Sequence, residues 1–257
     1  MKIAAERRER ILKHVEAGMT DADDLAATFE VSLSTIRRDL ARLSREGVLV
    51  RTYGGGTPVS HAAPEQSLAQ RADEQVKQKR AIARMAASLI EDGETIILDA
   101  GTTTGALALE LKLRVNLRVV TCGLTSLQVL AGQPGIELLS LGGTLRPVSL
   151  GFVGPYAELA LRRMTADRVF LGCDGIVASR GICESADEQA SLKDLMIAQA
   201  SEIYVLATAE KLGRATSHAW TTIDRPWTLI TDAGATPEQL EPFHKLGHVT
   251  IMRETKL

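Results

Sequence analysis

The first fifth of the chain carries charged residues interrupted by apolar positions that recur at the spacing of α-helices. This spacing predicts one helix over 5–17, a second around Leu25–Phe29 and a third over 33–43. Thr20 and Asp21 can each cap the second helix and Ser32 can cap the third, because these residue types favour the N-cap position. The pattern therefore predicts a compact unit of short helices.

A β-hairpin should follow, because VLVRTY (48–53) alternates as a strand and the glycines after it turn the chain back. Helices followed by a hairpin within about 55 residues are typical of a winged helix-turn-helix. The apolar positions of the third helix leave serine, threonine and arginine facing outward, where they could contact phosphates and base edges of DNA. The alternative is an ordinary surface helix whose charged face is solvated. The residues predicted to contact DNA are Ser32, Ser34, Thr35, Arg37, Arg38, Arg42, Arg51 and Tyr53.

The local charge of the N-terminal part is consistent with DNA binding, although the net charge of the whole chain does not indicate it. The chain has a net charge of −2, whereas 33–53 carries five arginines against Asp39 and Glu46, a net of +3. Such a local basic surface is the electrostatic footprint of a nucleic-acid partner. We therefore expect a DNA-binding domain over 1–56.

The rest of the chain reads as a linker and a larger α/β domain. The segment 57–67 has two prolines and no periodicity, so it predicts a linker. A long amphipathic helix is expected over 68–91, and apolar runs then alternate with helical segments. Strands are expected at 95–100, 117–122, 136–141, 168–173, 202–207, 227–231 and 248–252, with helices at 104–112, 124–132, 155–163, 187–200 and 237–245.

This alternation predicts a Rossmann-like, mainly parallel sheet covered by helices on both faces, within a domain over 68–257. Ligands bind such sheets beyond the carboxyl ends of the strands. The loop LDAGTTTGAL (98–107) lies at such an end and offers Asp99, glycine and hydroxyl groups before a helix. Gly101 there can adopt a positive φ. The loop either holds a phosphate or is an ordinary turn capped by threonine. The candidate contacts in it are Asp99, Gly101, Thr102, Thr103 and Thr104.

Three further strand ends supply candidate ligand contacts. A glycine pair lets the backbone approach a ligand, Arg146 could add a charge-assisted hydrogen bond, and Asp174 could accept sugar hydroxyls. Each has an alternative interpretation. Cys122 could be a small buried residue, Arg146 a solvated side chain on a hairpin-like turn, and Asp174 a residue that caps a turn. The candidates at these ends are Cys122, Gly123, Leu124, Gly142, Gly143, Arg146, Asp174 and Gly175.

These motifs together resemble the DeoR family of bacterial transcriptional regulators. RRERIL, VSLSTIRRDLARL and EGVLVRTYGGG are similar to its N-terminal domain. KRAIARMAASLIEDGETIILDAGTTT, LGGTLRP, FLGCDGI, ASLKDLM and EKLG are similar to its sugar-phosphate-sensing domain. The resemblance covers nearly the whole chain.

The resemblance implies a cytoplasmic repressor of a carbohydrate operon. It implies a homodimer or homotetramer that binds operator DNA and releases it when a phosphorylated sugar or polyol binds. The sensing domain of the family resembles ribose-5-phosphate isomerase and glucosamine-6-phosphate deaminase. Lys193 and Lys211 match family lysines and would neutralise phosphate. Cys122 and Thr208 depart from the family, which usually has asparagine and aspartate at these positions, so the usual sugar contacts are in question.

Other classes fit the sequence less well. Three cysteines without a CxxC motif indicate free thiols in a reducing compartment, and neither a signal peptide nor an apolar membrane span is expected. The scattered histidines predict no metal site, and no dinucleotide fingerprint or other cofactor motif occurs. The alternative function is an isomerase-like enzyme that carries a DNA-binding head, since several carboxylates lie in plausible loops.

Overall fold

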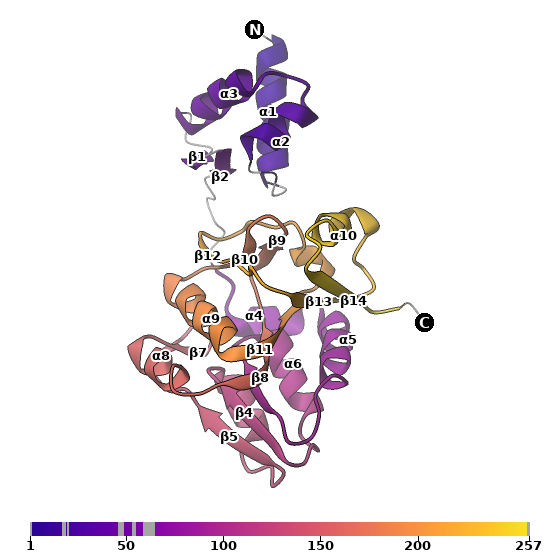
Figure 1. The fold of residues 1–257 in the computed structure, drawn as a ribbon. Helices are drawn as coiled ribbons and strands as arrows, with labels where there is room; N and C mark the ends of the chain where they lie inside the picture. Colours follow the sequence, from indigo (N-terminus) through magenta and orange to yellow (C-terminus); the bar gives the residue numbers. More distant parts are fainter. Residues whose placement is uncertain are drawn as a thin grey trace.

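The computed structural model of the protein describes residues 2–16, 19, 21–45, 49–52, 55–58 and 65–255 (Figure 1). The N-terminal part folds as helices followed by an antiparallel hairpin, as predicted. Its elements are α1 (Lys2–Glu16), α2 (Ala22–Thr28), α3 (Leu33–Arg45), β1 (Leu49–Thr52) and β2 (Gly55–Pro58).

The N-terminal helices pack around one apolar cluster. Ile11 of α1, Leu25 of α2 and Ile36 of α3 are fully buried in it. Asp21 caps α2, because its carboxylate accepts hydrogen bonds from the backbone N–H groups of Asp23 and Asp24. The arrangement fixes which face of α3 is buried and which face remains exposed.

The C-terminal part is built on a parallel sheet, which among the described residues has seven strands in the order β14-β13-β11-β8-β3-β4-β5. Every neighbouring pair in this sheet is parallel. The strands are β3 (Thr95–Leu98), β4 (Leu117–Thr121), β5 (Ile136–Ser140), β8 (Ala166–Leu171), β11 (Ala200–Leu206), β13 (Trp227–Thr231) and β14 (Val249–Arg253). Each corresponds to an apolar run that the sequence predicts as a strand.

Helices cover both faces of this sheet (Figure 1). Successive strand residues point to opposite faces, so Ile96 and Leu98 join the cluster beneath α5 and α6, whereas Ile97 joins the cluster beneath α8 and α9. The helices are α5 (Val76–Ala87), α6 (Thr102–Glu110), α7 (Leu124–Leu130), α8 (Pro155–Leu161), α9 (Asp187–Gln199) and α10 (Pro237–His244). The predicted α/β class with an N-terminal winged helix-turn-helix is thus the observed fold.

The single long helix expected over 68–91 is wrong. The segment forms two helices, α4 (Leu68–Asp73) and α5, and Gln75 between them has a left-handed φ of 50°. The ammonium group of Lys79 donates to the carbonyl oxygens of Arg71 and of Glu74, the latter at 2.7 Å. These carbonyls end α4 and have no partner in their own helix, so the buried lysine stabilises the break.

Short antiparallel elements that periodicity does not predict lie in the loops beyond the carboxyl ends of the parallel strands. Strands of three or four residues are too short to show a repeating pattern. These elements are β6 (Thr144–Arg146), β7 (Gly151–Val153), β9 (Gly175–Val177), β10 (Gly181–Glu184), β12 (Ala219–Thr221) and the 3₁₀ helix η1 (Ala209–Lys211). They extend the loops in which the candidate ligand contacts lie.

Candidate functional site

A pocket of about 720 Å³ lies beyond the carboxyl ends of the parallel strands. Thr102 begins α6 after the loop that follows β3, Asp174 comes from the loop after β8, and Lys211 ends η1 after β11. The lining residues are Glu65, Gln66, Arg71, Glu74, Lys79, Thr102, Asp174, Ser185, Glu210, Lys211, Arg214, Thr216, Ser217 and His218. Four acidic and four basic side chains therefore line it, beside several hydroxyl groups.

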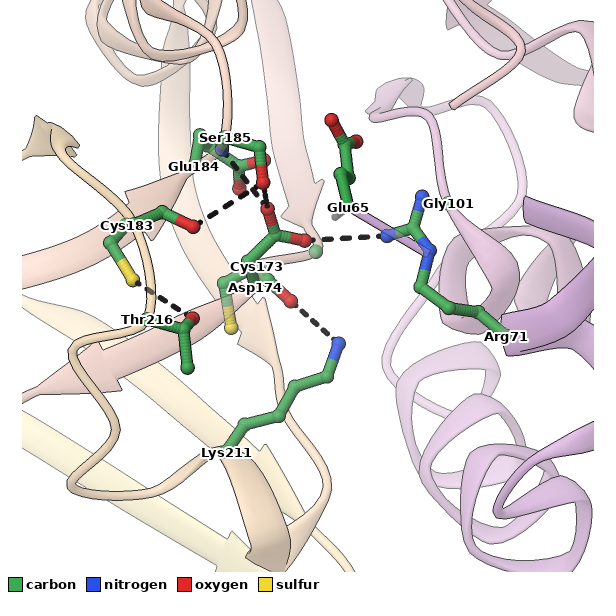
Figure 2. A network of polar contacts seen from close by, with 12 residues as sticks. Glu65, Arg71, Gly101, Cys173, Asp174, Cys183, Glu184, Ser185, Lys211 and Thr216 are labelled. Atoms are coloured by element: carbon green, nitrogen blue, oxygen red, sulfur yellow. Dashed lines mark hydrogen bonds and ion pairs between the residues drawn. The ribbon is translucent and has the colours of Figure 1, made fainter. Parts of the chain in front are cut away.

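Asp174 occupies the centre of the polar network in this pocket (Figure 2). Its Oδ2 atom accepts a hydrogen bond from the backbone N–H of Ser185 at 3.0 Å and one from the Ser185 hydroxyl at 2.6 Å. Its Oδ1 atom lies 3.3 Å from Nη1 of Arg71. The side chain is thus held by one strong set of contacts and by one longer ion pair.

Lys211 joins the same network on the side of Asp174 away from Ser185 (Figure 2). Its ammonium group donates to the carbonyl oxygen of Cys173 at 2.6 Å, next to Asp174. Gly175 lets the loop that carries Arg214 and His218 approach closely, since a Cβ atom there would lie 2.3 Å from the Arg214 carbonyl oxygen. The loop can therefore close one wall of the pocket.

Asp99 and Lys193, two predicted contacts, form a buried ionic cluster with Glu184 rather than lining the pocket. The Lys193 ammonium contacts the Asp99 carboxylate, lies 2.9 Å from Oε1 of Glu184 and donates to the Gly172 carbonyl at 2.8 Å. Asp99 also accepts from the backbone N–H of Ala100 at 2.8 Å and from that of Gly172 at 3.0 Å. The cluster ties α9 to the ends of β3 and β8.

The cluster holds two carboxylates against one ammonium, and this balance sets the pKa values. Burial raises the pKa of Glu184 to about 7, although Lys193 opposes the shift. Burial lowers the pKa of Lys193, but the charges of Asp99 and Glu184 outweigh that effect and leave this pKa above its usual value. Lys193 is therefore charged, and Glu184 exchanges its proton near neutral pH.

The threonines of the first loop divide between the pocket and the interior. Thr102 lines the pocket, whereas Thr103 and Thr104 are buried. The Thr104 hydroxyl donates to the Gly101 carbonyl at 3.2 Å and so stabilises the start of α6. Gly101 has a φ of 161°, which is extended backbone, so it does not use the left-handed conformation that glycine permits.

The loop after β4 packs against this first loop instead of lining the pocket. Cys122 is buried with its Sγ 3.8 Å from Oδ1 of Asp99, and burial together with that carboxylate raises the pKa of the thiol. Gly123 lies so close to Ala100 that a Cβ atom there would be 3.1 Å from the Ala100 Cα. The N–H of Leu124 donates to the Leu150 carbonyl at 2.9 Å. Thr208, at the other departure from the family pattern, is also buried.

Arg146 pairs with Glu65, which lies in the predicted linker and is the residue at which the described part of the chain resumes after Pro58. One guanidinium nitrogen lies 2.7 Å from the Glu65 carboxylate, and a second also contacts it. Gly142 and Gly143 form the turn before β6 with φ values of 66° and 105°, and a Cβ atom at Gly143 would lie 2.5 Å from the Val153 carbonyl oxygen. Glu65 lines the pocket, and Arg146 lies behind it.

Several lining residues have no counterpart among the sequence-based candidates. Arg71, Lys79 and Arg214 carry charge into the pocket, and the hydroxyl groups of Ser185 and Thr216 lie beside them. No motif in the sequence marks them, because long-range packing of α4 and of the 213–218 loop brings them there.

The candidate DNA contacts lie on the exposed face of α3. Ser34, Arg37, Arg38 and Arg42 are exposed, opposite the buried Ile36. The Ser32 hydroxyl lies 2.9 Å from that of Ser34 and 2.8 Å from that of Thr35, so the three hydroxyls form one cluster at the start of the helix. These residues form one continuous polar surface.

Two further candidate DNA contacts are not placed. Arg51 lies in β1, but its side chain is outside the described residues, and so is all of Tyr53. The described residues also hold no helix that could cross a membrane and no group of side chains that could hold a metal ion.

Both parts of the chain match families of known proteins. The DeoR-like helix-turn-helix domain matches residues 7–61, and the DeoR C terminal sensor domain matches residues 74–233. The chain is thus a DNA-binding transcriptional regulator with a sensor domain. It belongs to the DeoR family.

Two related proteins are similar in sequence to most of this chain. The transcriptional repressor AccR of Agrobacterium fabrum is 34% identical over 82% of this chain and 82% of its own length. The lactose phosphotransferase system repressor of Lactococcus lactis is 33% identical over 96% of this chain and 97% of its own length. The family domains and these relatives are regulators, and the chain is accordingly a regulator and not an enzyme.

Among solved structures, ribose 5-phosphate isomerase A of Methanocaldococcus jannaschii has a TM-score of 0.40 and 19% identity, over 54% of this chain and 55% of that chain. At this TM-score the resemblance supports no inference about the present protein.

Proposed function

We propose that this regulator represses a carbohydrate catabolic or transport operon, and that a phosphorylated sugar or polyol relieves the repression. The pocket carries the proposal, because it combines cations suited to phosphate with a carboxylate and hydroxyls suited to sugar hydroxyls. A relative named for a lactose phosphotransferase system supports the same class of effector.

Within the pocket, Thr102 and the start of α6 would hold the phosphate, since the N–H groups of a helix N-terminus favour anions. Lys211 would add a positive charge, and Asp174 would accept sugar hydroxyls. The other candidate residues would act behind this layer by holding the loops in place. This supporting group comprises Asp99, Gly101, Thr103, Thr104, Cys122, Gly123, Leu124, Gly142, Gly143, Arg146, Gly175 and Lys193.

On the DNA side, α3 would enter the major groove of the operator, with Arg38 at its centre. Two copies would place their helices about one helical turn apart, or a multiple of it, so the protein acts as a homodimer or homotetramer in the cytoplasm. In this proposal 1–56 forms the DNA-binding head, 57–67 the linker and 68–257 the sensing domain. The effector lowers operator affinity by roughly 5- to 150-fold, which is typical of allosteric coupling.

Fluorescence anisotropy with a labelled duplex from upstream of its own operon tests this function. Binding should weaken as salt rises, and one phosphorylated sugar in a panel should release the DNA while its unphosphorylated form does not. Arg38→Ala should reduce operator affinity at unchanged effector affinity. Consumption of a panel member without specific DNA binding would contradict the proposal.

Thr102→Glu tests the pocket itself. A carboxylate at this position repels a phosphate, so the variant should bind the operator normally and fail to respond to the effector. Thr165→Glu is the matched control, because Thr165 is exposed and does not line the pocket. A normal response in Thr102→Glu would remove the loop from the effector site.

A further inference from the structure

We infer that Arg71 is the anion-binding residue on the linker side of the pocket, and that effector binding transfers its guanidinium group from Asp174 to the anion of the effector. Because Arg71 lies on α4, the first helix after the linker, this transfer moves the element that leads to the DNA-binding head. The inference rests on the proposed function and adds the residue that couples the pocket to the head.

The guanidinium group of Arg71 has unused capacity for hydrogen bonds. Among the described residues, its Nε is buried without a hydrogen-bond partner, and its contact with Asp174 runs through Nη1 alone at 3.3 Å. Arginine offers five N–H donors in a planar fork that matches the oxygens of a phosphate. A buried donor without an acceptor is costly, so an anion that satisfies it gains free energy on binding.

Asp174 can release Arg71 at small cost. Its carboxylate keeps the two shorter hydrogen bonds from Ser185, at 2.6 and 3.0 Å, after the arginine leaves (Figure 2). A phosphate carries more negative charge than the carboxylate and offers three acceptor oxygens. The exchange therefore replaces the single long contact between Arg71 and Asp174 by a bidentate contact between Arg71 and the phosphate.

Three neighbouring lysines are committed to backbone carbonyls or to other carboxylates. Lys79 caps the end of α4, Lys211 donates to Cys173, and Lys193 lies in the buried cluster with Asp99 and Glu184. Burial, and then the charge of Lys211, lower the pKa of Lys79 to about 8. Added positive charge is thus already disfavoured around this lysine, and an incoming anion would relieve it.

The structure around α4 suits a moving element. The helix is bounded by the Ser67 capping box on one side and by the left-handed Gln75 on the other, so it is a short separate helix whose link to α5 runs through the Lys79 side chain. It is held through Glu65 on Arg146, through the Leu68 N–H on the Val148 carbonyl at 2.7 Å, through Arg71, and at its end through the ammonium group of Lys79. Loss of the Arg71 contact removes the anchor that faces the pocket and leaves the others in place.

Inorganic phosphate and hexose 6-phosphates serve as probes of this inference in calorimetry. Arg71→Gln should weaken their binding by about 10-fold or more, as expected for losing a hydrogen-bonded charge. Arg71→Lys, which keeps the charge but not the fork, should bind with intermediate affinity. Arg80→Gln is the matched control, because Arg80 is an exposed arginine on α5 outside the pocket, and it should bind as the wild type does.

Movement of α4 is read separately from an environment-sensitive dye on Ala69→Cys. Ala69 is exposed on α4, and the native cysteines are all buried, so labelling is selective. The dye signal should change with phosphate or hexose 6-phosphate and should not change when Arg71→Gln is added. Full-length protein is used throughout.

The outcomes separate this inference from the proposed function. Equal affinity of wild type and Arg71→Gln, with binding to both, overturns the inference and leaves the proposed function in place. Weaker binding in Arg71→Gln with a silent dye on the wild-type background overturns the coupling through α4. If the wild type binds neither phosphate nor any phosphorylated sugar, the proposed function fails and the inference fails with it.

Discussion

Glu184 illustrates how a single buried residue makes stability depend on pH. Its carboxylate is buried next to Lys193, with Asp99 on the other side of that ammonium group. Burial disfavours the charged form of Glu184, and the nearby ammonium group of Lys193 opposes this effect only in part. The pKa of Glu184 is therefore raised to about 7.

The raised pKa predicts that stability falls as the pH rises. Between about pH 4.5 and 7 the folded state holds the Glu184 proton that the unfolded chain has released. The stabilisation is fully present below the lower value and lost above the higher one. Its size is at most about 3 kcal/mol.

Urea unfolding of wild type and Glu184→Gln from pH 5 to 8 measures this effect. The variant should lose the part of the pH dependence that Glu184 contributes, so the free energy of unfolding of the wild type should fall relative to that of the variant as the pH rises from 5 to 7. Glu188→Gln, which changes an exposed glutamate on the same helix, should keep the wild-type curve. Parallel curves for wild type and Glu184→Gln would show that Glu184 does not titrate in this window.

At the scale of single residues, the sequence could not distinguish which candidates face a ligand. Asp99 and Lys193 belong to strand-end and family motifs, but they pair with each other across 94 positions in the interior. Thr102 and Thr103 are adjacent in one motif, yet one lines the pocket and the other is buried. Asp99 lies in a loop, which has no period, and Thr102 and Thr103 begin α6, where a repeating pattern has only started.

At the scale of elements, α3 depends on a buried aspartate as well as on its apolar stripe. Asp39 is buried, and its carboxylate lies 2.7 Å from Nε of Arg7 and 3.6 Å from Nη1 of Arg8. These ion pairs fasten the proposed recognition helix to α1. The outward orientation of Arg38 therefore rests on polar as well as apolar packing.

Asp39→Ala should loosen the head and weaken operator binding. The change leaves two arginines without their partner and costs roughly 1–3 kcal/mol of stability in the head. Hydrogen–deuterium exchange of α1 and α3 should become faster, while that of α5 stays unchanged. Asp23→Ala, at an exposed position on α2, is the control. Unchanged exchange in α3 would show that its apolar stripe alone holds the helix.

Long elements were predictable from sequence, and short ones were not. The apolar runs of β3, β4 and β13 and the helices after them lie within a few residues of their predicted bounds. The break between α4 and α5 escaped prediction, because it depends on Lys79 reaching back to two carbonyl oxygens rather than on a glycine or proline. The β6–β7 hairpin and the β9–β10–β12 sheet were not predicted, because their strands are too short to show a repeating pattern.

At the scale of the whole molecule, the proposed DNA surface and the proposed effector pocket lie in different parts of the chain. The surface is on α3, and the first residue along the chain that lines the pocket is Glu65, near the end of the predicted linker. Neither site shares a described side chain with the other, so one ligand influences the other through a change in the protein. An effector acts in this way only if it prefers the state with low DNA affinity.

Thermodynamic linkage turns this arrangement into a prediction. If the effector lowers operator affinity by a given factor, saturating operator DNA must lower effector affinity by the same factor, because both routes lead to the same ternary complex. We expect a factor between about 5 and 150, measured by anisotropy in one direction and by calorimetry in the other. Arg38→Ala should leave effector affinity without DNA unchanged, and Thr102→Glu should leave operator affinity without effector unchanged. Unequal factors in wild type would mean that a third equilibrium, such as assembly of the subunits, is linked to one of the two binding steps.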